Sequence, residues 1–328
     1  MNGSVAKSGM PVGRNELFRV ASASLLHAAM MLAAFPPFGL WWLIFLAPAP
    51  LVRAAMSPLR FRWTATLLFL PMVGTWLVHQ WWVSAVSGAG LVPMAAYLAA
   101  WTPLIAGVIR RIARSPRFDA WPFVFIVPIA WTGIEFLRAT IVFEGYPWYL
   151  LGQPLVEWLP LAQVADLGGV TILAILPAVT GGLAADLLVH RSGGGGRRIP
   201  ITFAIAVFVA WSIYGQSRLR SPGTGRSGPS ILAIQTDLPQ SNKVAWTPEQ
   251  QWQDAVSFAR GTIAAHTEAT RDSRPVDLVA WPETMLPGVG LEPESTRVMI
   301  DAGWWPGDRF VELAEEVQGM LGVPLLLG

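Results

Sequence analysis

Long stretches of apolar residues recur through the first 220 positions of the chain. A membrane core about 30 Å thick requires roughly 20 mostly apolar residues if a helix is to cross it. Helices are expected in these stretches, because lipid cannot satisfy unpaired backbone N–H and C=O groups. The stretches occupy residues 20–35, 39–56, 63–83, 90–109, 120–137, 168–189 and 200–215. The pattern therefore predicts a polytopic α-helical membrane bundle with about seven transmembrane helices.

Basic residues in the connections predict the orientation of this bundle. Thirteen Lys and Arg residues fall on one side of the expected spans, in segments 1–19, 53–62, 110–117 and 191–198. On the other side, the 138–167 segment carries only Arg138 and the shorter connections carry none. Cytoplasmic loops are enriched in Lys and Arg. We therefore expect residues 1–19 to be a cytoplasmic tail, residues 20–220 to form the bundle, and everything after residue 215 to lie outside the cytoplasm.

Residues 140–166 do not fit a membrane span. They mix aromatic residues with glycine and proline, as in the run from Gly145 through Trp148. Tyr and Trp prefer the level of the lipid headgroups. Two interpretations remain open, a segment lying in the outer membrane interface or an ordinary belt of aromatic residues.

The pattern changes to that of an α/β domain at about residue 229. Short apolar runs typical of buried strands occupy residues 230–235 and 277–281. A third strand is expected at 323–327, where the apolar run is left unsheltered. Amphipathic helices are expected between them at 248–266, with Thr247 as N-cap, and at 310–321. Alternating strands and helices predict a parallel sheet, so residues 221–328 are expected to form part of an α/β layer.

Composition supports the membrane assignment and excludes several kinds of chemistry. Hydrophobic residues make up 53% of the chain and charged residues only 13%, against about a quarter in soluble domains. The net charge of +2 gives no basic footprint for nucleic acid. There is no cysteine, and the four histidines are scattered, so no metal site or cofactor is expected. His27 and His79 fall in apolar stretches, where buried neutral histidines are favoured over a proton relay.

One carboxylate is a candidate for catalysis. Catalytic groups in open α/β sheets lie at the carboxyl ends of strands, and the expected strand 277–281 is followed directly by Pro282 and Glu283. An apolar setting would raise the pKa of Glu283 and suit it to general-base work. A carboxylate that merely caps the following turn is the alternative, and spacing alone does not decide between them.

Several segments together resemble a known family. The 277–284 run (DLVAWPET) and the loop with Lys243 and Trp246 are similar to the opening of the nitrilase, or carbon–nitrogen hydrolase, domain. Within that superfamily the chain resembles the apolipoprotein N-acyltransferases, because its membrane part is similar too. That similarity lies in residues 34–51 (AFPPFGLWWLIFLAPAPL), 145–154 (GYPWYLLGQP) and 161–170 (LAQVADLGGV).

The resemblance implies a bundle in the bacterial inner membrane and a periplasmic αββα nitrilase-like domain. It implies ping-pong acyl transfer, in which a cysteine thiolate takes an acyl chain from a phospholipid and passes it to the diacylglyceryl-cysteine of a lipoprotein. Glu283 matches the family's general base. The family's lysine, which stabilises the oxyanion, and its cysteine would both follow residue 328, so the chain is expected to be C-terminally truncated and inactive as it stands. Lys243 matches a different, loop-borne position.

Three further residues are candidates for binding substrate or lipid. Gly145 and Trp148 lie in the interfacial segment, and Trp246 lies in the loop before the first α/β helix. Exposed aromatic side chains beside a bilayer often contact lipid, although simple packing of either tryptophan is an equally physical interpretation. Two other functions stay open: a non-catalytic pseudoenzyme that binds lipid or lipoprotein, and a membrane-tethered amidase of the nitrilase type.

The orientation gives a direct prediction. A dual reporter that is fluorescent in the cytoplasm and enzymatically active outside it, fused after Leu219, should show only the external activity. The same reporter fused after Arg114 should show only fluorescence. Cytoplasmic fluorescence from the Leu219 fusion would contradict the predicted topology.

Overall fold

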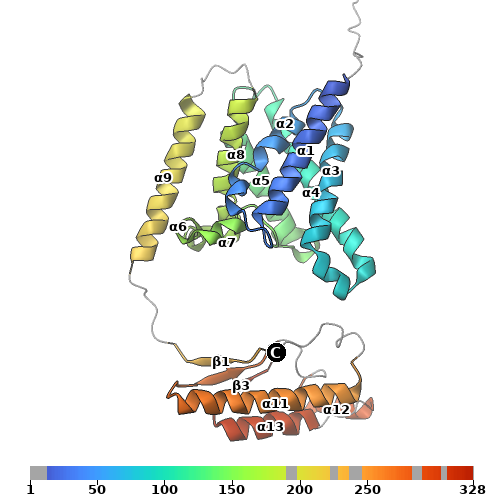
Figure 1. The fold of residues 1–328 in the computed structure, drawn as a ribbon, viewed down its shortest axis with the longest axis vertical. Coiled ribbons are helices and arrows are strands. Elements are labelled where there is room, and N and C mark those ends of the chain that lie inside the picture. The colour runs from blue at the N-terminus through green and yellow to red at the C-terminus, as the bar shows by residue number, and fades with distance from the viewer. Residues whose placement is uncertain are drawn as a thin grey trace, which may run out of the picture. The chain divides into compact units, whose positions relative to one another are not determined.

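The chain divides into two compact units, which are described separately. The computed structural model describes residues 13–189, 198–221, 228–235, 246–282, 290–303 and 309–327. The first unit is Met1–Pro222 and the second is Gly223–Gly328. Figure 1 labels the helices of the first unit and the strands and helices of the second.

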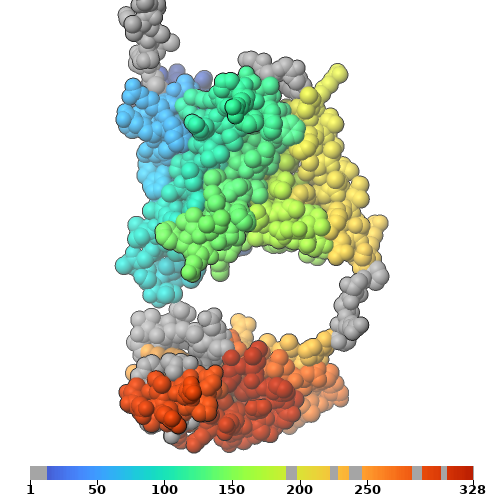
Figure 2. All heavy atoms as spheres, turned by 180° about the vertical axis from the view of Figure 1, so that it is seen from behind, coloured from blue at the N-terminus to red at the C-terminus, as the bar shows by residue number. Residues whose placement is uncertain are grey.

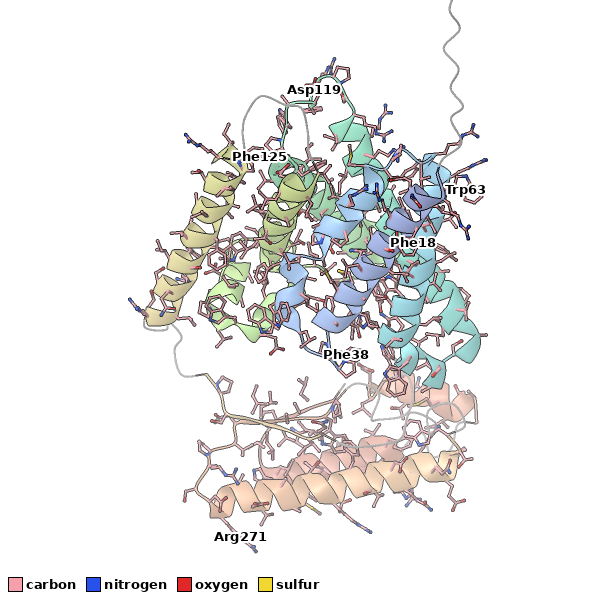
Figure 3. All side chains as sticks on the ribbon, turned by 45° about the horizontal axis from the view of Figure 1, so that its top comes forward. Phe18, Phe38, Trp63, Asp119, Phe125 and Arg271 are labelled. Carbon is pink, nitrogen blue, oxygen red and sulfur yellow. The ribbon has the colours of Figure 1, made fainter. Side chains whose placement is uncertain are left out.

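The first unit is a bundle of helices. Its α-helices are α1 (Arg14–Ala34), α2 (Pro48–Ala55), α3 (Phe61–His79), α4 (Gly88–Ala113), α5 (Phe123–Phe136), α6 (Leu159–Ala162), α7 (Ala165–Leu173), α8 (Ile175–Leu188) and α9 (Arg198–Arg220). Short helical turns are η1 (Trp41–Phe45), η2 (Trp81–Ala85), η3 (Leu137–Ile141), η4 (Val142–Glu144) and η5 (Gln153–Glu157). Large apolar side chains such as Phe18 and Trp63 point outward from the bundle (Figure 3), as expected of a surface solvated by lipid.

Five helical segments in the described part of this unit are long and apolar enough to cross a membrane, and a bent pair would make a sixth. The five are Arg14–Ala34, Phe61–His79, Gly88–Ala113, Phe123–Glu144 and Arg198–Arg220. Helices α7 and α8 form the bent pair, with 44° between them. These segments confirm a polytopic helical membrane bundle, whereas the count of seven spans stays a prediction.

The structure differs from the expected straight span at residues 39–56. That stretch forms η1 and then α2, two helices too short to cross a membrane alone. Pro48 and Pro50 at the start of α2 lack the backbone N–H groups that would bond back to the preceding turn, and two such gaps so close together favour a break there. The expected span at 168–189 is likewise divided, because the backbone of Gly168 and Gly169 is not helical.

Helix α8 lies against α2 and α5 through residues without bulky side chains. A Cβ atom at Gly181 would collide with the Pro48 ring, and one at Gly182 would collide with the Phe123 backbone. Small residues allow such close approach of helices in membranes, where association depends on packing. Further along α8, the Asp186 carboxylate accepts hydrogen bonds from the N–H groups of Phe123 (2.7 Å) and Val124 (2.9 Å). This carboxylate caps the start of α5.

The second unit is a small α/β layer. Its strands β1 (Ile231–Ala233), β2 (Leu278–Ala280) and β3 (Leu325–Leu326) form a parallel sheet in that order, as the sequence predicts. Its helices are α11 (Pro248–Arg271), α12 (Pro293–Asp301) and α13 (Arg309–Leu321). The expected N-cap at Thr247 is confirmed as a capping box with Gln250. Helix α12 was not expected from the apolar pattern.

One face of this sheet is covered by helices. Leu232, Val279 and Leu325 share that face through the strand register, and they pack with buried residues of α11 and α13, which Figure 1 shows on the same side of the sheet. On the other face, Ile231 and Leu326 are more than half exposed among the described residues. The first strand, expected to be buried, is thus exposed at Ile231, whereas the exposure of Leu326 agrees with the expectation of an unsheltered final strand.

The contact between Asp186 and α5 yields a stability prediction. The N-cap residue of α5 is Pro122, which offers no side-chain acceptor, so Asp186→Ala removes the acceptor from two N–H groups at the start of the helix. We expect a loss of about 1–2 kcal/mol, seen as a lower thermal unfolding midpoint in detergent. Asp186→Asn keeps one acceptor and should lose less. Equal midpoints for wild type and Asp186→Ala would contradict this role.

Candidate functional site

The chain folds back on itself directly after α5. Helix η3 widens the last turn, and a short segment then follows in which several residues adopt positive φ angles: Phe143 (52°), Glu144 (63°), Gly145 (93°) and Tyr149 (55°). The Tyr146 N–H closes this turn with a hydrogen bond to the Arg138 carbonyl oxygen (2.8 Å). Residues other than glycine adopt such conformations only where surrounding contacts enforce them. These residues belong to the stretch 140–166, for which a position at the membrane interface stays a prediction, and we call residues 142–157 the interfacial segment after that prediction.

Gly145, an expected binding residue, has a structural explanation. Its φ of +93° is accessible to glycine at little cost. A Cβ atom there would collide with the carbonyl oxygen of Ala139. The residue therefore lets the interfacial segment approach η3 closely, and its contribution to the site comes through the backbone.

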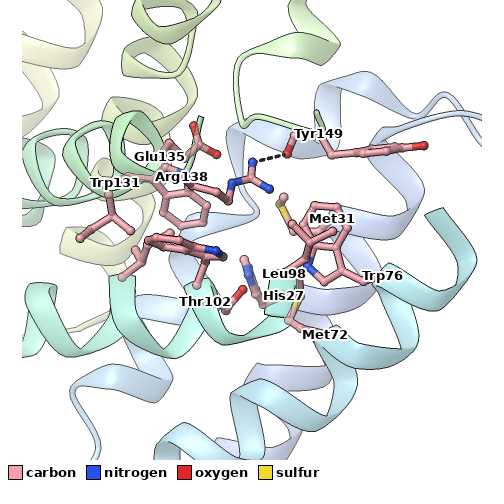
Figure 4. A pocket seen from close by; sticks show the side chains of 13 residues that line it. His27, Met31, Met72, Trp76, Leu98, Thr102, Trp131, Glu135, Arg138 and Tyr149 are labelled. Carbon is pink, nitrogen blue, oxygen red and sulfur yellow. Dashed lines mark hydrogen bonds between the residues drawn. The ribbon is translucent and has the colours of Figure 1, made fainter. Parts of the chain in front are cut away.

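Arg138 binds the backbone of the interfacial segment from inside the bundle. Its side chain is buried, with 3% of the residue exposed. One guanidinium nitrogen donates to the carbonyl oxygens of Trp148 (3.1 Å) and Tyr149 (3.3 Å), and the guanidinium lies 5.4 Å from the centroid of the Trp76 ring. The fixed fork of arginine suits contact with two adjacent carbonyl groups and with an aromatic face. Figure 4 shows this side chain reaching from its helix to Tyr149.

Glu135 anchors the next part of the same segment. It lies one helical turn before Arg138, is 5% exposed, and accepts a hydrogen bond from the Leu151 N–H (2.9 Å). The opposite charges of Glu135 and Arg138 attract each other at this short spacing. Because a buried charge without a partner is costly, the two side chains and the segment that they bind stabilise one another.

Tyr149 attaches the segment to the end of α3. Its hydroxyl donates to the His79 carbonyl oxygen (3.0 Å), and its ring stacks on the His79 ring at 4.4 Å between centroids. The rings of Phe35 and Trp76 meet it edge-on at 5.2 and 5.7 Å. Burial raises the pKa of Tyr149, so its hydroxyl stays protonated and able to donate.

A small cavity lies beneath these contacts inside the bundle. It encloses about 30 Å³, enough for one or two water molecules if polar groups hold them. Polar side chains at its wall include His27, Thr102, Glu135 and Arg138 (Figure 4). His27 is buried, as expected, and its Nδ1 atom lies 2.8 Å from the Ala47 carbonyl oxygen. The cavity is too small for a lipid or a peptide.

A larger cleft opens at the outer side of the interfacial segment. It encloses about 260 Å³ between the end of α1 and this segment, and it is lined by Ala34, Phe35, Pro36, Gly39, Trp148, Tyr149, Gln153, Pro154, Val156 and Glu157. Trp148 is 52% exposed at its rim, with its ring centroid 6.1 Å from that of Trp82. Glu157 provides an exposed carboxylate. The cleft can accept an apolar chain next to a polar or cationic group.

The remaining candidate residues belong to the second unit. The Trp246 indole N–H donates to the Asp254 carboxylate (2.9 Å), which ties this half-buried side chain to α11. Glu283 and Lys243 lie outside the described residues. Trp281, two positions before Glu283, is buried after β2, and its indole N–H donates to the Thr262 hydroxyl (3.0 Å). Within the described ranges, no group of three or more His, Cys, Asp or Glu residues is suited to a metal ion.

The roles expected of the candidate residues in binding substrate or lipid stay predictions. The structure brings Gly145 and Trp148 into one segment, whereas Trp246 lies in the other unit. Sequence reasoning missed Glu135 and Arg138 as its anchors. The signal was present, since two charges three residues apart at the end of an apolar stretch mark a functional position in a membrane helix.

Comparisons with known proteins point to one family. Residues 27–183 match the family model described as the apolipoprotein N-acyltransferase N-terminal domain. Curated proteins named apolipoprotein N-acyltransferase are similar over most of this chain. The protein of Vibrio parahaemolyticus is 26% identical over 88% of this chain and 55% of its own length, and that of Chromobacterium violaceum is 30% identical over 81% and 49%. The chain spans about half the length of these relatives.

The anchoring role of Arg138 can be tested. Arg138→Ala leaves Glu135 as an uncompensated buried charge and releases two carbonyl groups, so we expect a loss of about 3 kcal/mol. The unfolding midpoint in detergent should fall, and proteases should cut the interfacial segment faster.

The double variant Glu135→Gln with Arg138→Met removes both charges and should recover much of the midpoint. Arg117→Ala, which changes an exposed arginine, serves as the control and should behave as wild type. A midpoint and a cleavage rate unchanged by Arg138→Ala would exclude the anchoring role.

Proposed function

Residues 27–183 belong to the apolipoprotein N-acyltransferase N-terminal domain family, and from this premise we propose that the chain supplies the membrane domain of a lipoprotein N-acyltransferase. The substrates are a membrane phospholipid as acyl donor and a diacylglyceryl lipoprotein as acceptor. The site lies in the bacterial inner membrane, with the N-terminus in the cytoplasm and the second unit in the periplasm. The family match supports this proposal, because the similar curated proteins are named apolipoprotein N-acyltransferase.

The proposed reaction proceeds through a thioester. A thiolate attacks an ester carbonyl of the phospholipid and releases the lysophospholipid, and the lipoprotein amine then attacks the thioester and restores the thiol. Glu283 is the base that removes protons from the thiol and later from the amine. The 328 residues contain no cysteine, so this chemistry needs a thiol that they do not supply, and we expect no acyl transfer by them alone.

The second unit is proposed to be part of a nitrilase-like αββα domain. Its parallel sheet is covered by α11 and α13 on one face, whereas the apolar side chains of Ile231 and Leu326 are exposed on the other. An α/β layer with one bare apolar face needs a second layer against it. Trp281, fixed to Thr262 at the end of the central strand, supports placing the following carboxylate at the carboxyl edge of the sheet.

The cleft next to Trp148 is proposed to bind an acyl chain of a lipid substrate. The observation that carries this proposal is the coincidence of the family match with an apolar cleft of about 260 Å³ held open by buried side chains. Phe35, Pro154 and Val156 offer apolar walls, and Glu157 can attract an ammonium group at the rim. A non-catalytic lipid-binding protein would use the same cleft, so the test must measure both binding and chemistry.

Photolabelling tests the binding part of the proposal. The purified chain in phosphatidylethanolamine nanodiscs is irradiated with a phospholipid that carries a diazirine on its acyl chain, and labelled peptides are mapped by mass spectrometry. We expect labels on residues 34–39 and 148–157, reduced about fivefold in Trp148→Ala through the lost apolar contact. Trp158→Ala is the matched control, because Trp158 is similarly exposed (43%) but does not line the cleft. Equal labelling of both variants would contradict the cleft assignment.

The same nanodiscs test the chemistry. With a diacylglyceryl lipopeptide added, we expect the mass of the peptide to stay unchanged when only the 328 residues are present. Transfer of an acyl chain to the peptide amine under these conditions would refute the requirement for a cysteine from outside this sequence.

A further inference from the structure

A second apolar groove lies in the bundle between α5, α8 and α9. It encloses about 550 Å³, within the range of sites that hold small apolar ligands. Aromatic, aliphatic and proline side chains make up its entire lining: Trp121, Pro122, Val124, Phe125, Pro128, Ile129, Ile175, Val179, Phe203 and Val207. It lies at the start of α5, whereas the cleft next to Trp148 follows the end of α5.

The groove has the depth of one membrane leaflet. Trp121 and Pro122 precede α5, and on that helix the groove reaches Ile129, six residues after Phe123, a rise of about 9 Å at 1.5 Å per residue. On α8 it reaches Ile175, eleven residues before the Asp186 that caps α5, a rise of about 16 Å. Half of a hydrocarbon core about 30 Å thick is about 15 Å. The groove thus runs from one membrane surface to about the midplane.

Helix α9 leaves this space open because it packs weakly against the bundle. Only 17% of its most apolar window is buried, against 39% for α1 and 44% for the segment that contains α5. The ring centroids of Phe125 and Phe203 approach to 4.6 Å and provide one point of contact with α5. Figure 2 shows α9, in yellow, along the side of the bundle, and Figure 3 shows Phe125 on the side of the bundle that α9 occupies.

The walls of the groove differ in burial. Val124, Val179 and Ala204 form a buried cluster at its base, whereas Ile129 is 59% exposed on its open side. Since α5 and α9 are among the segments able to cross a membrane, the open side faces lipid. Empty apolar space of this size next to fluid acyl chains does not stay empty, because the walls gain dispersion contacts when it fills.

We propose that this groove is a binding site for one acyl chain of a membrane phospholipid, which wedges between α9 and the rest of the bundle. An extended peptide segment does not fit the lining, since no side chain there can satisfy its backbone N–H and C=O groups in the absence of water. The headgroup then lies at the level of Trp121, beside the connection after α4 that carries Arg114 and Arg117. By the predicted topology the lipid belongs to the cytoplasmic leaflet, opposite to the leaflet of the proposed acyl transfer.

The bound chain has a mechanical role. Helix α9 is the last helix of the first unit and leads to the second. With little protein around α9, the acyl chain supplies side contacts that α5 and α8 do not make. The site therefore stabilises the position of α9 and does not take part in chemistry.

Native mass spectrometry tests the site in the full 328-residue chain, extracted in a mild detergent. We expect about one phospholipid to stay bound to the wild type. Val207→Trp places an indole in the groove and should lower the retained phospholipid at least fivefold. Ile205→Trp adds the same side chain to the same helix at a position that is 57% exposed and does not line the groove, so it should retain lipid as wild type does.

Two further measurements complement lipid retention, and the first of them uses the wild type alone. Photolabelling of the wild type with the diazirine phospholipid should mark residues 121–129 and 203–207. Delipidation should lower the thermal midpoint of the wild type and of Ile205→Trp, but not that of Val207→Trp, whose groove is already filled. Equal lipid retention by the two variants, absence of retained lipid and label in the wild type, or a dimer that Val207→Trp alone dissociates would overturn the proposal.

Discussion

The buried charges of Glu135 and Arg138 set the main constraint on the bundle. A carboxylate and a guanidinium inside an apolar helix end are costly unless both find partners. Both side chains bind backbone groups of residues 148–151. The segment that follows α5 therefore folds back onto the bundle, and its path fixes where the cleft lies and which side of Trp148 is presented to the membrane.

Two kinds of packing coexist in this bundle. Where Gly181 and Gly182 of α8 meet α2 and α5, the contact is too close for even a Cβ atom. Where α9 meets α5 and α8, the side chains are larger and a groove remains. The first kind holds a helix by protein contacts alone, and the second makes lipid part of the structure. Both follow from side-chain size along α8 and α9.

The sequence predicts this architecture well where an apolar pattern is long, and poorly where a few residues interrupt it. Most of the spans were found within a few residues of their ends, because lipid requires continuous apolar helices. The interruption of 39–56 depends on Pro48 and Pro50, and the bend before α8 depends on local backbone geometry, which hydropathy does not report. The sheet of the second unit followed from the alternation of elements, whereas the short α12 has too little periodicity to stand out.

The candidate site was harder to predict than the fold. The sequence context draws attention to Gly145 and Trp148, whereas Arg138 stands in the sequence as a lone cation in a connection. Its burial depends on the turn of η3, which directs the side chain inward toward Trp76. Glu135 falls inside an expected span, and its role as an anchor is visible only from its hydrogen bond with the Leu151 N–H in the folded chain. Contacts across a turn of positive φ angles cannot be derived from spacing.

The hydroxyl of Tyr149 also carries a consequence for which side chains position 149 tolerates. The His79 carbonyl at the end of α3 has no partner further along its own helix, and the Tyr149 hydroxyl satisfies it from another part of the chain. Phenylalanine would keep the stacked ring but leave that oxygen without a hydrogen bond. Serine has no ring to stack, and its side chain is too short to reach the oxygen. Tyrosine combines a flat ring with a hydroxyl donor at the far end of that ring. We therefore expect position 149 to tolerate almost no other amino acid.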